Sequence, residues 1–344
     1  MAGTAFDSSA LTLGEYATSS NDPIVHKITF SLHNTLNVLQ DIPLQTQPTF
    51  IRKGVKFIDN LPSVNWKPLG SIPTVTKGKP TPYEDQVWIV RNQFQVDEMV
   101  QNEQNSIGNF LETQIDAWME AFQYDMNTKF FLNAHDGSGG VTGDPNGPVG
   151  LKFRLDNAST YGVASEMKID FAGTDMTTSM TATTANTFIE NLQQVLDYMN
   201  TTTGDGVVIY MNDTLKRRFD RAIRVAGLGA GFAATKDAFD RSVDTYKNAK
   251  IRDVGRQVDQ TTRVLGNESA TGAAWTSGSK YTSMYAVRYG AGYFGGWQYR
   301  PLKPQRLGLD PTNGVAYNVV VNWAVGFWQE HTRAIARGYD IKIA

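Results

Sequence analysis

The sequence lacks several features that would each indicate a class of protein. It contains no cysteine, which excludes disulfide bonds and thiolate metal sites. Charged residues are only 19% of the chain, and 32 basic against 34 acidic residues leave a formal net charge of −2. A nucleic-acid reader usually carries a basic excess, so that class is disfavoured. No apolar run approaches the ~18 residues of a membrane span, and residues 1–16 lack a signal-peptide pattern. We therefore expect a globular protein made in a cytoplasm, with no membrane partner.

The first part of the chain predicts a flexible arm followed by one short helix. Residues 1–21 are small and polar, which is typical of a terminal arm. From Val25 to Leu39, apolar residues recur every three or four positions, as on one face of a helix. Pro43 and Pro48 end this pattern.

Two strand-like segments with a proline-rich connection follow. Residues 50–58 and 86–96 are rich in β-branched and aromatic residues. Between them lie five prolines and two glycines. Because proline removes backbone donors, this connection cannot be the centre of a compact sheet. We predict a long two-stranded arm, and such an isolated hairpin needs a partner surface to be stable.

The strongest helix pattern begins at Ile107 and ends near Phe130, over about 24 residues. At ~1.5 Å per residue this helix is on the order of 36 Å long. It stops at a glycine-rich loop, with six glycines between residues 137 and 150, and residues 151–155 predict a strand.

Residues 165–310 predict a mixed unit of helices and strands. Thr184 is expected to cap a helix with Phe188 and Leu192 facing inward, and Asn212-Asp213 to cap a second one. Short strands are predicted at residues 206–211, 250–254, 262–265 and 284–288. In the last part of the chain, residues 317–323 alternate as in a strand, and residues 333–343 predict a strand pair.

The order of these elements resembles the major capsid proteins of tailed double-stranded DNA phages, which have the Hong Kong 97 fold. The segments Gly147-Pro148-Val149-Gly150-Leu151 and Tyr285-Ala286-Val287-Arg288-Tyr289-Gly290 are similar to turns of that family. The resemblance implies an α+β fold with a long spine helix. It also implies an N-terminal arm (1–45), an extended E-loop hairpin (46–98), a peripheral domain (99–165 and 311–344) and an axial domain (166–310).

The resemblance further implies a structural role in the virion. The chain is expected to self-assemble through hexamers and pentamers, in the host cytoplasm, into an icosahedral shell. That shell encloses double-stranded DNA without sequence-specific binding. Because only about 45 residues precede the hairpin, we expect a separate scaffolding protein, besides portal and decoration proteins. No enzyme activity and no cofactor are expected.

Six residues of the predicted hairpin are candidates for contacts between subunits. They are Arg52, Trp66, Lys67, Lys77, Lys79 and Arg91. Some members of the family cross-link a hairpin lysine to an asparagine of a neighbour, which makes Lys77 and Lys79 of interest. The simpler interpretation is that both lysines are solvated.

Three other motifs carry little weight. Residues 227–231 (GLGAG) have Phe232 where a dinucleotide loop needs its third glycine. His26 and His33 lack a third metal ligand, and His135-Asp136 lies in a glycine loop without a nucleophile elbow. We therefore predict no catalytic, cofactor or metal residue.

Two alternatives remain open. One is an encapsulin-like compartment, which shares the fold but packages a cargo enzyme. The other is a soluble two-domain enzyme, for which seven Trp and 14 Tyr suggest carbohydrate as a substrate, although no carboxylate pair stands out. Assembly mass separates them, because a shell weighs megadaltons and an enzyme tens of kilodaltons.

Overall fold

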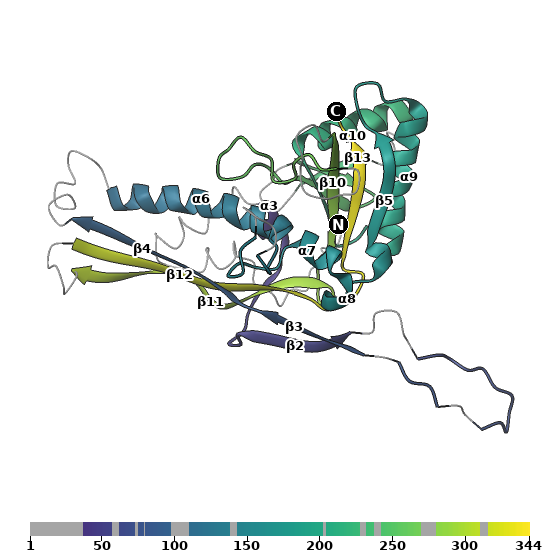
Figure 1. The fold of residues 1–344 in the computed structure, drawn as a ribbon, viewed down its shortest axis with the longest axis horizontal. Helices are drawn as coiled ribbons and strands as arrows, with labels where there is room; N and C mark the ends of the chain where they lie inside the picture. The colour runs from purple at the N-terminus through teal and green to yellow at the C-terminus, as the bar shows by residue number, and fades with distance from the viewer. Residues whose placement is uncertain are drawn as a thin grey trace.

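A computed structural model describes residues 37–56, 62–72, 75–78, 80–97, 110–137, 143–201, 204–227, 232–236, 242–269, 280–309 and 316–344. The molecule is built around two sheets that meet at an angle, and a two-stranded hairpin projects from their junction (Figure 1). The predicted helix of residues 25–39 lies almost wholly outside the described residues. Its last residues belong to a short helix, α3 (Asn37–Asp41).

The first sheet has four strands in the order β1-β11-β12-β4. Their bounds are β1 (Leu44–Thr46), β4 (Trp88–Asp97), β11 (Phe294–Leu309) and β12 (Ala316–Gln329). The predicted spine helix is confirmed as α6 (Phe110–Leu132), which runs along one face of this sheet (Figure 1). The rings of Phe122 and Trp323 meet there at 5.9 Å, edge to face. The long helix therefore buries its stripe against the alternating strand predicted at the end of the chain.

The second sheet has seven strands in the order β5-β13-β10-β6-β9-β8-β7. Their bounds are β5 (Lys168–Asp175), β6 (Val207–Met211), β7 (Phe232–Lys236), β8 (Ser242–Tyr246), β9 (Ala249–Asp253), β10 (Tyr281–Arg288) and β13 (Ile335–Lys342). All five residues of β6 are buried, as its continuous apolar run predicts. Three of the strands predicted in this unit are therefore confirmed.

Two helices cover one face of the seven-stranded sheet: α9 (Ala182–Tyr198) and α10 (Asp213–Ala226). They pack on each other through Phe188 and Phe219, whose rings are 5.9 Å apart. Asn212 caps α10 as predicted, because its side chain accepts from the backbone N–H of Leu215. The cap of α9 is Thr181 and not Thr184; the two threonines form a reciprocal capping box.

Three sequence-based predictions are wrong. Residues 151–155 form a helix, α7 (Leu151–Asp156), because Leu151 and Leu155 both bury themselves at helical spacing. It is followed by α8 (Ala158–Tyr161) and a 3₁₀ turn (Ser165–Met167). Residues 262–265 form no strand: Asp259 accepts from the N–H groups of Thr261 and Thr262 and holds a turn there, and Arg263 makes an isolated bridge to Arg256. Residues 333–343 give one strand, β13, which pairs with β10 on one side and β5 on the other.

The hairpin also differs from the prediction in its pairing. The partner of β2 (Ile51–Lys56) is β3 (Thr81–Gln86), and not the strand of residues 86–96. That later strand, β4, crosses over to pair with β12 in the four-stranded sheet. Consequently the paired stem is short, and the proline-rich connection extends beyond it (Figure 1).

Candidate assembly surfaces

The most exposed apolar surface lies beyond the hairpin stem. The described residues 62–72 and 75–78 form neither helix nor strand. Five large apolar side chains here are between 80% and 107% exposed: Val64, Trp66, Leu69, Ile72 and Val75. We call the segment that carries them, residues 62–75, the hairpin tip. Isolated exposed apolar residues are common on monomers, but five of them along one short segment mark an interaction surface.

One turn stabilises the hairpin tip locally. The N–H and the hydroxyl of Ser71 both bond to the carbonyl of Pro68, at 3.2 and 2.9 Å. Gly70 has φ of +89°, a conformation that suits glycine. Lys67 Nζ donates to the carbonyl of Ile72 at 2.6 Å, which draws the two sides of the turn together. The backbone is thus shaped while the apolar side chains stay outside.

The base of the hairpin is fixed by a buried ion pair. Arg154 of α7 donates from Nη2 to Asp85 Oδ1 of β3 at 2.7 Å, and both side chains are almost fully buried. The same guanidinium also reaches the carbonyl of Phe327 in β12, at 3.2 Å. The backbone N–H of Gln329 donates to the other oxygen of Asp85. The hairpin is therefore held where α7 and the four-stranded sheet meet.

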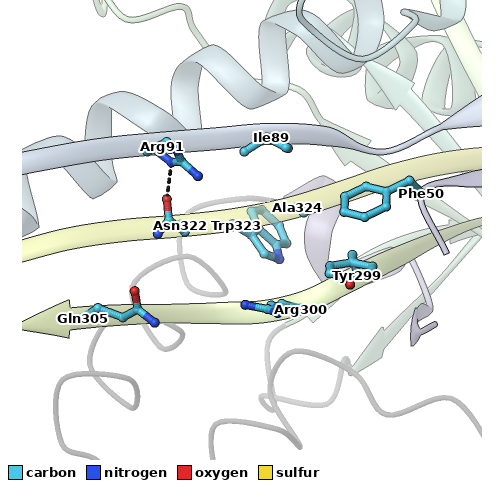
Figure 2. A pocket seen from close by; sticks show the side chains of 9 residues that line it. All are labelled: Phe50, Ile89, Arg91, Tyr299, Arg300, Gln305, Asn322, Trp323 and Ala324. Carbon is cyan, nitrogen blue, oxygen red and sulfur yellow. Dashed lines mark hydrogen bonds between the residues drawn. The ribbon is translucent and has the colours of Figure 1, made fainter. Parts of the chain in front are cut away.

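A shallow groove of about 470 Å³ lies on the face of the four-stranded sheet that is turned away from α6 (Figure 2). Phe50 and Tyr299 stack at its end with ring centroids 4.2 Å apart. Ile89 and Ala324 lie opposite each other in register on β4 and β12, and Ile89 is more than half exposed. The groove offers an apolar floor beside the root of the hairpin.

Two arginines border this groove. Arg91 donates from Nε to Asn322 Oδ1 at 2.7 Å (Figure 2). Arg300 lines the β11 side. The groove therefore has an apolar floor and cationic borders, a combination that suits an apolar segment carrying carbonyl or carboxylate groups.

The six predicted contact residues lie in different surroundings. Trp66, Lys67 and Lys77 are exposed on the hairpin tip or just after it. Arg91 borders the groove. Arg52 is engaged within its own chain, where it pairs with Glu330 and its guanidinium lies 4.1 Å from the centre of the Trp328 ring. Lys79 lies outside the described residues. Sequence reasoning missed Leu69, Ile72 and the groove; the signal for the first two was large apolar residues between prolines.

A second anchor ties α3 and β1 to both sheets. Asp41 accepts from Arg252 Nε and Nη2 at 3.3 Å each. Burial raises the pKa of Asp41, and the guanidinium of Arg252 offsets this only in part. Tyr210 also donates to Asp41 at 3.4 Å, while β1 pairs in parallel with β11. Residues 37–46 therefore join the two sheets.

A third polar cluster is buried where α7 meets the seven-stranded sheet. Arg337 of β13 donates to Glu268 Oε2 at 2.8 Å and to the hydroxyl of Ser283 at 3.1 Å. Lys152 of α7 lies 3.6 Å from Glu268 Oε1. Burial lowers the pKa of Lys152, with Glu268 acting in the opposite direction. Since every charged group here has a partner within the chain, the cluster is better explained as a contact that holds α7 on the seven-stranded sheet than as a reactive site.

The described part of the chain shows neither a metal site nor a membrane-spanning helix. No group of three or more His, Asp or Glu side chains in that part of the chain could hold a metal ion. None of the helices with described residues is long and apolar enough to cross a membrane.

Comparison with known proteins gives matches among solved structures alone. No protein-family model and no curated protein matches the sequence. The chain is similar to the holo-SrpI encapsulin complex from Synechococcus elongatus PCC 7942, with a TM-score of 0.57, 11% identity, and coverage of 89% of this chain and 87% of that chain. It is similar to the capsid of the native GTA particle (TM-score 0.54, 10% identity, 90% of each chain). The capsid of Myoviridae phage XM1 also matches (TM-score 0.54, 13% identity, 89% of this chain and 91% of that chain).

These likenesses extend over nearly the whole of each chain, at identities of 10–13%. They establish the fold, which is the one these shell proteins share. The predicted α+β, Hong Kong 97-like fold is thereby confirmed.

Proposed function

We propose that this chain is a shell subunit, the major capsid protein that builds the icosahedral head of a tailed phage. The observation that carries the proposal is the hairpin tip, where five large apolar side chains are exposed on a segment without a core of its own. Burying one such side chain contributes about 1.5–3 kcal/mol. The tip therefore gains stability only on another molecule, and assembly supplies that surface.

The groove beside Phe50 and Ile89 is the receiving surface that we infer on the neighbouring copy. It is apolar at its floor and lies on the sheet face that α6 leaves uncovered. A tip from one copy that enters the groove of the next makes a heterologous contact, and such contacts form a ring when the rotation from copy to copy closes on itself. In this scheme Trp66 and Lys67 contact the neighbour through the tip, and Arg91 through the groove.

The remaining parts of the proposal concern organisation and partners. Residues 1–45 act as the N-terminal arm, 46–98 as the E-loop, 99–165 with 311–344 as the peripheral domain, and 166–310 as the axial domain. Hexamers and pentamers form the shell in the host cytoplasm, with a separate scaffolding protein, a portal and decoration proteins. The shell encloses double-stranded DNA, and the subunit performs no catalysis.

The test replaces residues 62–80 with a short Gly-Ser turn that joins β2 to β3. We expect a folded subunit that forms no shells, as judged by circular dichroism and electron microscopy. Trp66→Ser/Leu69→Ser should have the same effect, whereas Lys53→Ser/Glu84→Ser, which changes an exposed ion pair on the stem, should leave shells intact. Normal shells from the replacement would contradict the proposal.

An encapsulin-like compartment is a second candidate, because the encapsulin complex is among the similar structures. The contents of purified shells separate the two. Packaged double-stranded DNA supports the phage capsid, whereas small shells that hold a cargo protein support the compartment.

A further inference from the structure

The outer face of α10 carries a stripe of arginines. This helix has five basic residues against two acidic ones, in a chain whose net charge is −2. Arg217, Arg221 and Arg224 are exposed, at spacings of four and three residues, so they line one face over ~10 Å. Arg217 pairs with Asp213 at 3.3 Å. Arg221 makes no ion pair within the described part of the chain. This face points away from the sheet, since Leu215, Phe219 and Ile223 occupy the opposite side.

An acidic surface lies on the other side of the seven-stranded sheet. Glu120 of α6 is exposed and accepts a hydrogen bond from Gln260, next to Asp259. Asp259 accepts from the N–H groups and hydroxyls of Thr261 and Thr262, which hold its pKa at about 2, so it stays ionised. Arg256 and Arg263 are the basic side chains of the same turn: Arg256 donates to the carbonyls of residues 260 and 261, and Arg263 pairs with Asp213. Because Asp213 offsets Arg263, the carboxylates of Glu120 and Asp259 outweigh the one remaining cation, Arg256, and the surface is acidic.

Each of these two surfaces also carries an exposed valine. Val225 on α10 is 37% exposed and Val258 beside Asp259 is 50% exposed. Among the described residues, every other exposed large apolar side chain lies on the hairpin, in the groove strands or next to them. Within the part of the chain that the structure describes, Val225 and Val258 are therefore the exposed large apolar residues of the seven-stranded unit. Val225 lies in the basic surface and Val258 in the acidic one.

The two surfaces are on opposite sides of the same unit. Figure 1 shows α9 on one side of the seven-stranded sheet and α6 on the other, and α10 lies on the α9 side because Phe219 packs on Phe188 of α9. The end of α6 packs on that other face through Phe131, whose ring is 5.1 Å from Tyr210 of β6. Within one copy the two surfaces are linked through Asp213, which pairs with Arg217 of the stripe and with Arg263 of the turn. Among the described residues, Arg221 and Arg224 make no ion pair with Glu120 or Asp259 of their own copy, and two copies placed side by side can bring these groups together.

We propose that the α10 stripe (Arg217, Arg221, Arg224 and Val225) of one copy docks on the acidic surface (Glu120, Val258 and Asp259) of the next. The partner is a second copy of this chain, and the contact is head to tail, so it propagates around a ring. It rests on the proposed shell function and adds a contact separate from the hairpin. Exposed ion pairs contribute little each, so this contact chiefly sets which surfaces meet and in which register.

The test is a charge exchange. Arg221→Glu/Arg224→Glu reverses the stripe. Glu120→Lys/Asp259→Asn reverses the acidic surface while asparagine keeps the acceptor that the turn needs. We expect each double variant to raise the protein concentration needed for shell formation by about tenfold. The quadruple variant should recover most of the loss. Lys247→Glu/Lys280→Glu, which shifts the net charge as Arg221→Glu/Arg224→Glu does but at exposed positions outside both surfaces, should assemble as the unmodified chain does.

Assembly is measured by sedimentation velocity and electron microscopy, with the scaffolding protein co-expressed if the chain alone gives no shells. Circular dichroism checks that each variant is folded. Unchanged assembly of Arg221→Glu/Arg224→Glu overturns the inference while leaving the shell function intact. A defect that the quadruple variant does not recover means that α10 binds something else, such as a polyanion, and also overturns it. Absence of any large assembly from the unmodified chain refutes the shell function instead.

Discussion

The buried pair of Arg154 and Asp85 is expected to control the stability of the hairpin base. Asp85→Ala removes the carboxylate and leaves the guanidinium of Arg154 buried without a counter-charge. Breaking a buried ion pair from one side typically costs ~3–5 kcal/mol of unfolding free energy. Arg154 keeps the carbonyls of Phe327 and Val149 as acceptors, at 3.2 and 3.4 Å. We therefore expect a loss of unfolding free energy near the lower end, about 3 kcal/mol.

The adjacent residue supplies a matched control. Glu84 pairs with Lys53 at 2.8 Å, but both side chains are more than half exposed. Glu84→Ala should change the unfolding free energy by about 0–1 kcal/mol. The double variant Asp85→Ala/Arg154→Met removes both charges and should recover at least half of the loss, because no charge remains buried alone.

The assay is a denaturant titration of the unassembled subunit, with hydrogen exchange of the β2 and β3 amides as a second readout. A cost below about 1 kcal/mol for Asp85→Ala would refute the reasoning. So would equal losses for Asp85→Ala and Glu84→Ala, since burial would then not decide the outcome.

Two further substitutions test the core and the second anchor. Phe122→Ala should cost about 3–5 kcal/mol of unfolding free energy, because the ring is buried between α6 and β12. Trp118→Ala should lower the unfolding free energy by less, since Trp118 is only partly buried. Equal losses for the two variants in the same denaturant titration would contradict this dependence on burial. The pKa of Asp41 is raised in the folded chain, so the folded state binds the carboxyl proton more tightly than the unfolded state does. The stabilisation that this proton gives to the folded chain is therefore lost as pH rises above 3.8. The unfolding free energy of Asp41→Asn should therefore increase relative to that of the unmodified chain as pH rises from 4 to the raised pKa. Denaturant titrations at several pH values measure this difference, and a difference that does not change with pH would contradict the prediction.

Several features were determined by the sequence because their cause is local. The apolar stripe of α6, the all-buried run of β6 and the Asn212 cap of α10 each depend on neighbours within a few residues. The prolines between residues 62 and 82 likewise exclude a compact sheet wherever the chain places them. The order of such elements was enough to indicate the fold.

Strand pairing, in contrast, was decided only by the tertiary structure. Residues 81–86 became the partner of β2 because Asp85 is held by Arg154, 69 residues further along the chain. The strand β11 was missed, since its prolines and glycines disfavour a strand in isolation. In the folded chain the strand requires glycine at two positions: a Cβ atom on Gly295 would lie 2.6 Å from Trp328, and one on Gly296 would lie 2.6 Å from Leu44.

The candidate surfaces follow the same division. The sequence could indicate that the hairpin carries apolar and basic residues without a core. The groove of Phe50, Ile89, Tyr299 and Ala324 draws residues from both ends of the chain, and the two charged surfaces are defined by opposite sides of one sheet. A composition or a spacing contains no information on which distant segments become neighbours, so these surfaces exist only once the two sheets have formed.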